Sequence, residues 1–107
     1  MATYYYTAGR TKPIIHQLLG REWGDRSDRP FDATGTTLTL QLTNQAGVAI
    51  VTTADVTWED AVESKAKYTP DAGDLVSGAT LTAHWVVTDG GEIFHVPEGP
   101  GDTWEIS

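Results

Sequence analysis

The histidines are the side chains of this sequence that could most readily bind a metal ion or transfer a proton near neutral pH. His16, His84 and His95 are far apart along the chain, and no two of them have the close spacing of metal ligands on one element. His84 and His95 flank Asp89-Gly90, so a hairpin turn there would place them on adjacent strands, where they could share a metal ion. Two solvent-facing histidines on neighbouring strands explain the same pattern more simply, and we predict no metal site.

Two groups of carboxylates are dense enough to be considered as metal or acid–base sites. The first is Glu59-Asp60 with Glu63, and the second is Asp71 with Asp74. A calcium loop needs alternating oxygen ligands closed by a bidentate acid, and neither group has that spacing. We interpret both groups as acidic turns that keep edge strands soluble.

No other catalytic motif is present in the sequence. The glycines of Gly90-Gly91 and of 99–101 lie between expected strands, and no helix follows them that could bind a phosphate. None of the serines lies in a Gly-x-Ser-x-Gly turn of the kind that holds a nucleophile. We therefore predict no catalytic residue, no cofactor and no enzyme activity.

The run Tyr4-Tyr5-Tyr6 is the feature that most needs a binding partner. Residues 1–11 show no alternating core pattern, so we interpret them as an extended N-terminal arm and residues 12–107 as the domain. Burial of each tyrosine is worth about 1.5–3 kcal/mol, which an isolated arm cannot gain. We expect the arm to dock on a neighbouring subunit or to add a strand to its sheet edge. The alternative is a first strand of this same domain.

Length and composition describe one domain without covalent cross-links. A chain of 107 residues has the size of a single core, and the absence of cysteine excludes disulfides and zinc–thiolate sites. No apolar run approaches the roughly 20 residues that span a bilayer, and the first ten residues lack the apolar stretch of a secretory signal. The sequence thus predicts neither a membrane-spanning segment nor a secreted precursor.

The charge of this chain is unevenly distributed. The net charge is −8, yet residues 1–29 carry five of the seven basic groups. These five are Arg10, Lys12, Arg21, Arg26 and Arg29. An acidic body repels phosphate backbones, so we predict no nucleic-acid partner. The basic segment could dock onto the acidic body of a neighbouring copy, or it could be ordinary surface charge.

Alternating apolar and polar residues predict an all-β domain. The clearest strand is Thr36–Thr43, and the longest is Ala79–Thr88, which places Trp85 in the core. Further strands are expected at Val48–Thr52, Asp55–Glu59, Glu63–Tyr68, Glu92–Val96 and Thr103–Ile106. Six or seven short strands in a chain of this length fit an antiparallel, immunoglobulin-like β-sandwich.

The region before Gly35 is less regular. Pro13–Leu19 is either a first strand or a short helix with proline in its first turn, and we favour the strand because of its isoleucines. Arg21–Asp32 is polar and is expected to be a loop that exposes Trp23.

Turn and strand signals follow one another in a distinctive order from Arg29 onward. They are Arg29–Thr36 before the Leu38–Leu42 strand, Lys67-Tyr68, Gly73-Asp74-Leu75, Thr82–Val87, Asp89-Gly90 and Phe94–Pro97. This order resembles the immunoglobulin-like N-terminal domain family of tailed-bacteriophage baseplate upper proteins. The sequence departs from the usual Leu, Tyr and Phe of that family at Ala33, Leu81 and Trp85.

The resemblance implies a phage virion part, in which such domains attach receptor-binding or fibre proteins to a symmetric core. We expect a non-catalytic virion protein, assembled in the host cytoplasm, that acts either as a tail or baseplate attachment module or as a capsid decoration or head fibre. Its expected partners are other virion proteins and copies of itself in a homo-oligomer. The residues expected to bind them are Tyr4, Tyr5, Tyr6, Arg10, Lys12 and Trp23.

A function of another class remains open. Sandwich domains also bind carbohydrates through exposed aromatic rings, and the sequence offers Trp23 or Trp104 for that purpose. The alternative prediction is therefore a carbohydrate-binding β-sandwich with a glycan as its partner.

Overall fold

The computed structural model describes residues 3–18, 32–52, 55–71, 73–97 and 100–107, with the backbone alone for residues 50–52. Within these ranges the chain forms nine strands and no helix, so the prediction of an all-β fold is confirmed. No helix in the described ranges is long and apolar enough to cross a membrane.

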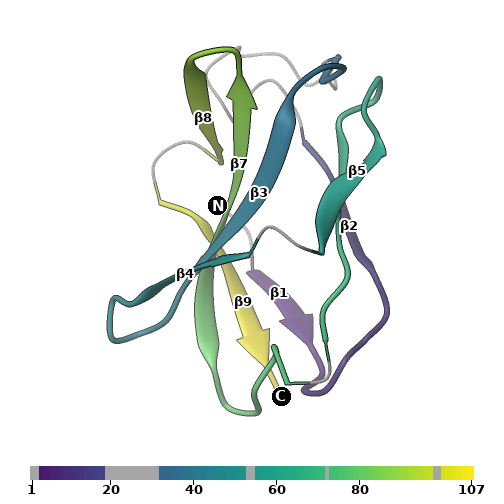
Figure 1. Ribbon diagram of the computed structural model, residues 1–107. Helices are drawn as coiled ribbons and strands as arrows, with labels where there is room; N and C mark the ends of the chain where they lie inside the picture. Colours follow the sequence, from purple (N-terminus) through teal and green to yellow (C-terminus); the bar gives the residue numbers. More distant parts are fainter. Residues whose placement is uncertain (1–2, 19–31, 53–54, 72, 98–99) are drawn as a thin grey trace.

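The strands form two sheets that pack face to face (Figure 1). The large sheet has the order β1 (Thr3–Tyr6), β9 (Asp102–Ile106), β7 (Thr80–Asp89), β3 (Thr37–Thr43) and β4 (Ala49–Thr52), and β8 (Glu92–Val96) also pairs with β7. The small sheet has the order β2 (Ile14–Gln17), β6 (Lys65–Tyr68) and β5 (Val56–Asp60). This division of strands between two sheets is that of an immunoglobulin-like sandwich, as predicted.

The centre of the large sheet follows directly from sequence alternation. In β3, Leu38, Leu40 and Leu42 are buried, and the residues between them are partly exposed. In β7 the buried residues are Leu81, Ala83, Trp85 and Val87. Leu40 lies opposite Trp85, whose exposed fraction is only 1%. Trp85 is therefore a core residue, as the alternation of Ala79–Thr88 predicts.

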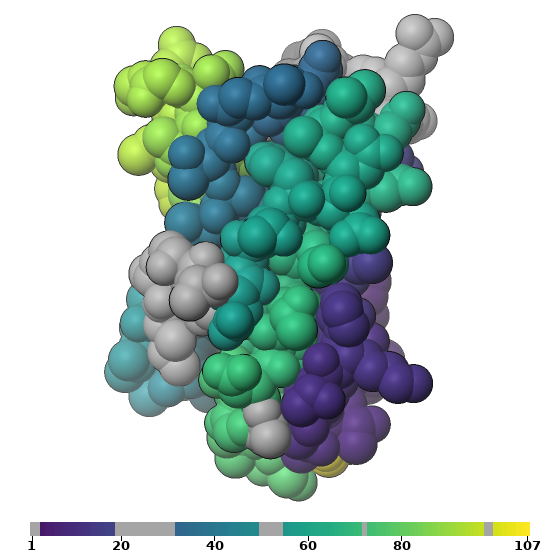
Figure 2. All heavy atoms as spheres, turned by 45° about the vertical axis from the view of Figure 1, so that its right-hand side comes forward, coloured from purple at the N-terminus to yellow at the C-terminus, as the bar shows by residue number. Residues whose placement is uncertain are grey.

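The small sheet closes the other side of the core. Ala66 and Tyr68 of β6 and Val56 of β5 point inward and are buried. Ile14 of β2 has an exposed fraction of 2%, and the segment pairs with β6, which confirms a strand at this position. In Figure 2, the purple atoms of β2 lie beside the teal and green atoms of β5 and β6 on the face turned forward.

β8 and β9 occupy one strand position beside β7. β8 pairs with the second half of β7 after the turn at Gly90, where φ is +64°, and β9 pairs with the first half. The chain leaves the sheet between Val96 and Asp102 and returns through Gly101. A Cβ atom at Gly101 would lie 2.6 Å from the carbonyl oxygen of Ala83, so only glycine fits this return.

The prediction of an extended arm at residues 1–11 is wrong. β1 is an edge strand of the large sheet, paired in parallel with β9 from Thr3 opposite Thr103 to Tyr6 opposite Ile106. Ser107 extends the pairing, since its N–H donates to Tyr6 O and its carbonyl accepts from Ala8 N, both at 3.0 Å. Four residues are too few to show a period, and the partner strand lies at the other end of the sequence. This pairing is also parallel, so the sandwich is not purely antiparallel.

Candidate partner-binding surface

The tyrosine run lies against a group of rings that joins the two sheets. Tyr4 and Tyr6 contact His16 and Trp104, with ring centroids 4.5 Å apart for Tyr4 and His16 and 5.0 Å for Tyr6 and Trp104. Trp85 completes the contact, with its ring centroid 5.6 Å from that of His16 and 6.4 Å from that of Trp104. We call these five residues the aromatic cluster. It connects β1, β7 and β9 of the large sheet to β2 of the small sheet.

His16 is the polar centre of the aromatic cluster. Its Nδ1 lies 3.4 Å from Trp85 Nε1, and its Nε2 lies 2.9 Å from the hydroxyl oxygen of Tyr6. An indole N–H can only donate, so Nδ1 accepts, and the proton of the neutral ring is on Nε2, which donates to Tyr6. Burial lowers the pKa of His16, and the negative charge of Asp102 opposes part of this shift. His16 is thus a neutral residue that positions rings.

Tyr6 is held within its own domain. Its hydroxyl accepts from His16, and burial, followed by the charge of Tyr4, raises its pKa to about 12. The guanidinium carbon of Arg10 lies 5.4 Å from the ring centroid of Tyr6, within the range of a cation–π contact. Tyr6 therefore has little surface left for a partner.

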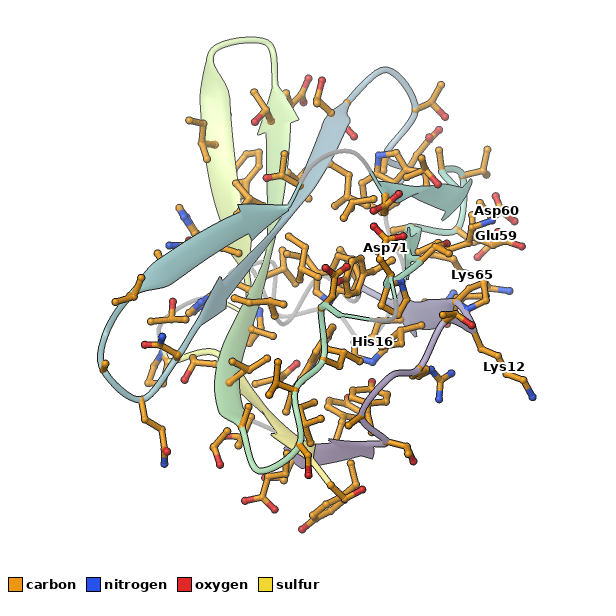
Figure 3. All side chains as sticks on the ribbon, turned by 60° about the horizontal axis from the view of Figure 1, so that its bottom comes forward. Lys12, His16, Glu59, Asp60, Lys65 and Asp71 are labelled. Atoms are coloured by element: carbon orange, nitrogen blue, oxygen red, sulfur yellow. The ribbon has the colours of Figure 1, made fainter. Side chains whose placement is uncertain are left out.

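Arg10 and Lys12 have different surroundings. Arg10 donates from Nε to the carbonyl of Lys12 and from Nη2 to the carbonyl of Pro13, each at 3.1 Å, so its side chain shapes the connection from β1 to β2. Lys12 is exposed, and Figure 3 shows its side chain extending away from the domain. Its place at the surface agrees with a role in binding, whereas Arg10 is already committed to backbone groups.

Tyr5 has the most accessible ring of the three consecutive tyrosines. Tyr5 is 75% exposed, whereas Tyr4 is 36% exposed because its ring packs against that of His16. Trp23, the remaining predicted binding residue, lies outside the described residues. Of the predicted set, the structure thus offers Tyr5, Lys12 and part of Tyr4 to a partner.

A pocket of about 260 Å³ opens beside the aromatic cluster, between Tyr4, Ile15, His16, Gln17, Leu18, Trp85 and Asp102. It is slightly smaller than the roughly 300–1,000 Å³ of typical ligand sites. The ring nitrogens of His16, its most versatile polar group, are both engaged by cluster residues. We assign no chemistry to this pocket.

The structure places some of the histidines and carboxylates considered as metal ligands close to one another. His84 and His95 lie on the adjacent strands β7 and β8, as predicted, with ring centroids 6.0 Å apart, although the strand partner of His95 is Val86. Among the described residues, the group of three possible metal ligands is Asp55, Asp71 and Asp74, whose carboxylate oxygens lie within 4.8 Å of one another. Asp71 and Asp74 are close in sequence. Asp55, which directly precedes β5, is brought next to them only by folding.

Asp74 has a structural role within this acidic group. Its Oδ2 accepts from the hydroxyl of Tyr68 and from the backbone N–H of Asp71, each at 2.9 Å. Burial, and then the hydrogen bond to Asp74, raise the pKa of Tyr68. Asp74 also lines a second pocket of about 360 Å³, whose other walls include Leu42, Leu81 and Tyr68. The two hydrogen bonds of Asp74 connect it to β6 and to Asp71.

The carbohydrate-binding alternative loses one of its two tryptophans. Trp104 is completely buried in the aromatic cluster, so the expectation that it could face a glycan is wrong. Trp104 faces inward from β9, where its ring packs against Tyr6 of β1 and Tyr68 of β6. The role expected for Trp23 stays a prediction.

Comparison with known proteins gives a similarity of fold. No protein-family model matches the chain, and no curated protein matches it. Among solved structures, the chain is similar to the N-terminal domain of phage TP901-1 ORF48, with a TM-score of 0.60 and 15% sequence identity. The similarity covers 96% of this chain and 82% of that one. At this identity the comparison shows that the two chains share a fold.

Proposed function

We propose that this chain is a non-catalytic structural module of a tailed-phage virion, which is assembled in the host cytoplasm and holds other virion proteins in the particle. The observation that carries the proposal is the fold shared with the N-terminal domain of phage TP901-1 ORF48 along 96% of the chain. The order of turns and strands from Arg29 onward supports the same assignment from residue types alone.

The surroundings of the reactive side chains support a structural role over a catalytic one. His16 and Tyr6 bind each other and pack in the aromatic cluster. Asp74, in the densest acidic group, accepts hydrogen bonds from Tyr68 and Asp71. A general acid or base must reach a substrate proton, whereas the hydrogen bonds of His16, Tyr6 and Asp74 join residues of this domain to one another.

Purified particles of the phage that encodes this chain provide the test. We expect mass spectrometry of gradient-purified particles to find the chain at a fixed ratio to the major capsid protein. Gold-labelled antibodies should mark one place on the particle, and that place distinguishes a head decoration from a tail or baseplate module. A host cytosolic protein of similar abundance serves as the negative control. Detection of the chain in the lysate but not in purified particles would reject the proposal.

A further inference from the structure

The large sheet has one side turned away from the small sheet, and we call this side the outer face. It consists of the odd-numbered residues of β3 and the even-numbered residues of β7, together with the residues of β1, β8 and β9 that share this side. Threonine is its commonest residue, and its centre is formed by Thr39 opposite Val86 and Gln41 opposite His84. Among the side chains that the structure describes on this face, Glu105 alone carries a formal charge at pH 7.

The opposite side of the sandwich is charged. Lys65 and Lys67 point outward from β6 beside Glu59 of β5, and Lys67 Nζ lies 3.2 Å from Glu59 Oε2. Figure 3 shows Glu59, Asp60, Lys65 and Lys12 gathered at the small-sheet side of the molecule. The outer face is therefore depleted of charge in a chain that carries a net charge of −8.

Charge depletion on a broad face has a recognised meaning in protein association. The centres of protein interfaces are depleted of Lys, Glu and Asp and enriched in aromatic residues relative to the rest of the surface. The outer face also exposes two large apolar side chains on its edge strands, Tyr5 on β1 and Ile93 on β8, which are 75% and 60% exposed. Both side chains belong to strands of the large sheet.

We propose that two copies of this chain pack their outer faces against each other about a two-fold axis. A strongly acidic chain repels its own copy wherever carboxylates would meet, and the outer face has a single carboxylate, near one end at Glu105. A two-fold interface uses the same patch on both copies, so a neutral patch complements itself. The domain measures 34 × 24 × 23 Å, and its broad side is large enough for the roughly 800 Å² per partner of a standard interface.

This arrangement has a salt dependence opposite to that of a charge-driven contact. Screening weakens the mutual repulsion of two acidic bodies while leaving contacts between neutral residues in place, so added salt should tighten the pairing. Docking of the basic residues Arg10 and Lys12 onto the acidic body of another copy would weaken as salt is added. The direction of the salt effect therefore separates the two modes of self-association.

Sedimentation of the full chain tests the proposal, with variants matched in the charge that they introduce. At about 100 µM, where a micromolar contact is saturated, we expect a dimer. Thr39→Asp and Gln41→Lys should each raise the dissociation constant at least tenfold. Because the lysine lowers the net negative charge, loss of pairing in both variants would locate the contact on the outer face. Thr57→Asp and Thr57→Lys, on the charged side, should leave the dimer intact, and circular dichroism confirms that every variant is folded.

Three results would overturn the inference. They are a chain that stays monomeric at this concentration, a dimer that survives both outer-face substitutions, and a dimer that weakens with salt. If the parent chain is monomeric but Thr39→Asp alone prevents its incorporation into particles, the face binds a different virion protein. The pairing does not depend on the proposed virion role, since sedimentation and particle composition are measured separately.

Discussion

His16 shows how a residue that sequence reasoning treats as a possible metal ligand can serve packing instead. It stands on β2 and faces Tyr4 and Tyr6 of β1, Trp85 of β7 and Asp102 of β9. Both of its ring nitrogens are used in the neutral form. Protonation would place a second donor against the Trp85 N–H, which can only donate.

The lowered pKa of His16 gives the protein a pH-dependent stability. Burial lowers this pKa from 6.5, so the unfolded chain binds the proton more readily than the folded one. The contribution of His16 to the free energy of unfolding is therefore complete above pH 6.5 and declines as pH falls below it, until the folded pKa is passed. We expect the melting temperature to decrease from pH 7.5 to pH 5.

A variant identifies the group responsible for this decrease. His16→Gln keeps a polar side chain but has no titrating ring, so its melting temperature should be lower at pH 7.5 and should change less between pH 7.5 and pH 5. An equally steep dependence in His16→Gln would assign the effect to other groups.

At the scale of the element, β1 illustrates what a local pattern cannot show. Its four residues pair with β9, one hundred positions further along the chain, and the ring of Tyr6 contacts that of Trp104. A run of three tyrosines without a visible period predicts an arm, because the strand that pairs with it is remote in sequence. The aromatic cluster was missed for the same reason, since its five residues come from four strands.

Substitution of Tyr6 measures how firmly β1 belongs to the domain. Tyr6→Ala removes a half-buried ring, its edge contact with Trp104 and its hydrogen bond with His16, so the free energy of unfolding should fall by about 2 kcal/mol. Urea unfolding measures the change. Lys12→Ala, at an exposed position nearby, should stay within about 0.5 kcal/mol of the parent. An independent arm would make the two variants equally stable.

Gly101, directly before β9, lies so close to β7 that it has no room for a side chain. A Cβ at position 101 would approach Ala83 O, His84 Cε1 and Thr82 Cγ2 at 2.6, 2.7 and 2.8 Å. Since the first of these atoms is backbone, Gly101→Ala must displace β9 from β7, and we expect a loss of about 1–3 kcal/mol in urea unfolding.

A matched glycine provides the control for position 101. Gly73 has no atom within 4 Å of its hypothetical Cβ, so Gly73→Ala should be neutral or slightly stabilising. Equal effects of the two substitutions would show that the close approach at position 101 relaxes at little cost.

At the scale of the whole molecule, sequence reasoning succeeded where one strand carries its own signal. Alternation located β3 and β7 and placed Trp85 inside, and the turn at Asp89-Gly90 fixed the β7–β8 hairpin. Contacts between segments far apart in sequence were not predicted, because the aromatic contact between Tyr6 and Trp104 and the grouping of Asp55 with Asp71 and Asp74 form only in the folded chain. The candidate binding residues were thus found by type, but which of them remain accessible was decided by the assembled sheet.

Trp85 tests whether the two sheets behave as one cooperative unit. It packs opposite Leu40 in the large sheet and donates to His16 of the small sheet, so Trp85→Ala removes a central core ring and a contact between sheets. Truncation of a buried Trp typically costs about 3–5 kcal/mol, which in a domain of this size lowers the melting temperature by more than about 10 °C. Circular dichroism and the fluorescence of the remaining tryptophans should report the same single transition. A variant that melts within a few degrees of the parent, or whose two signals separate, would mean that the sheets are held together elsewhere.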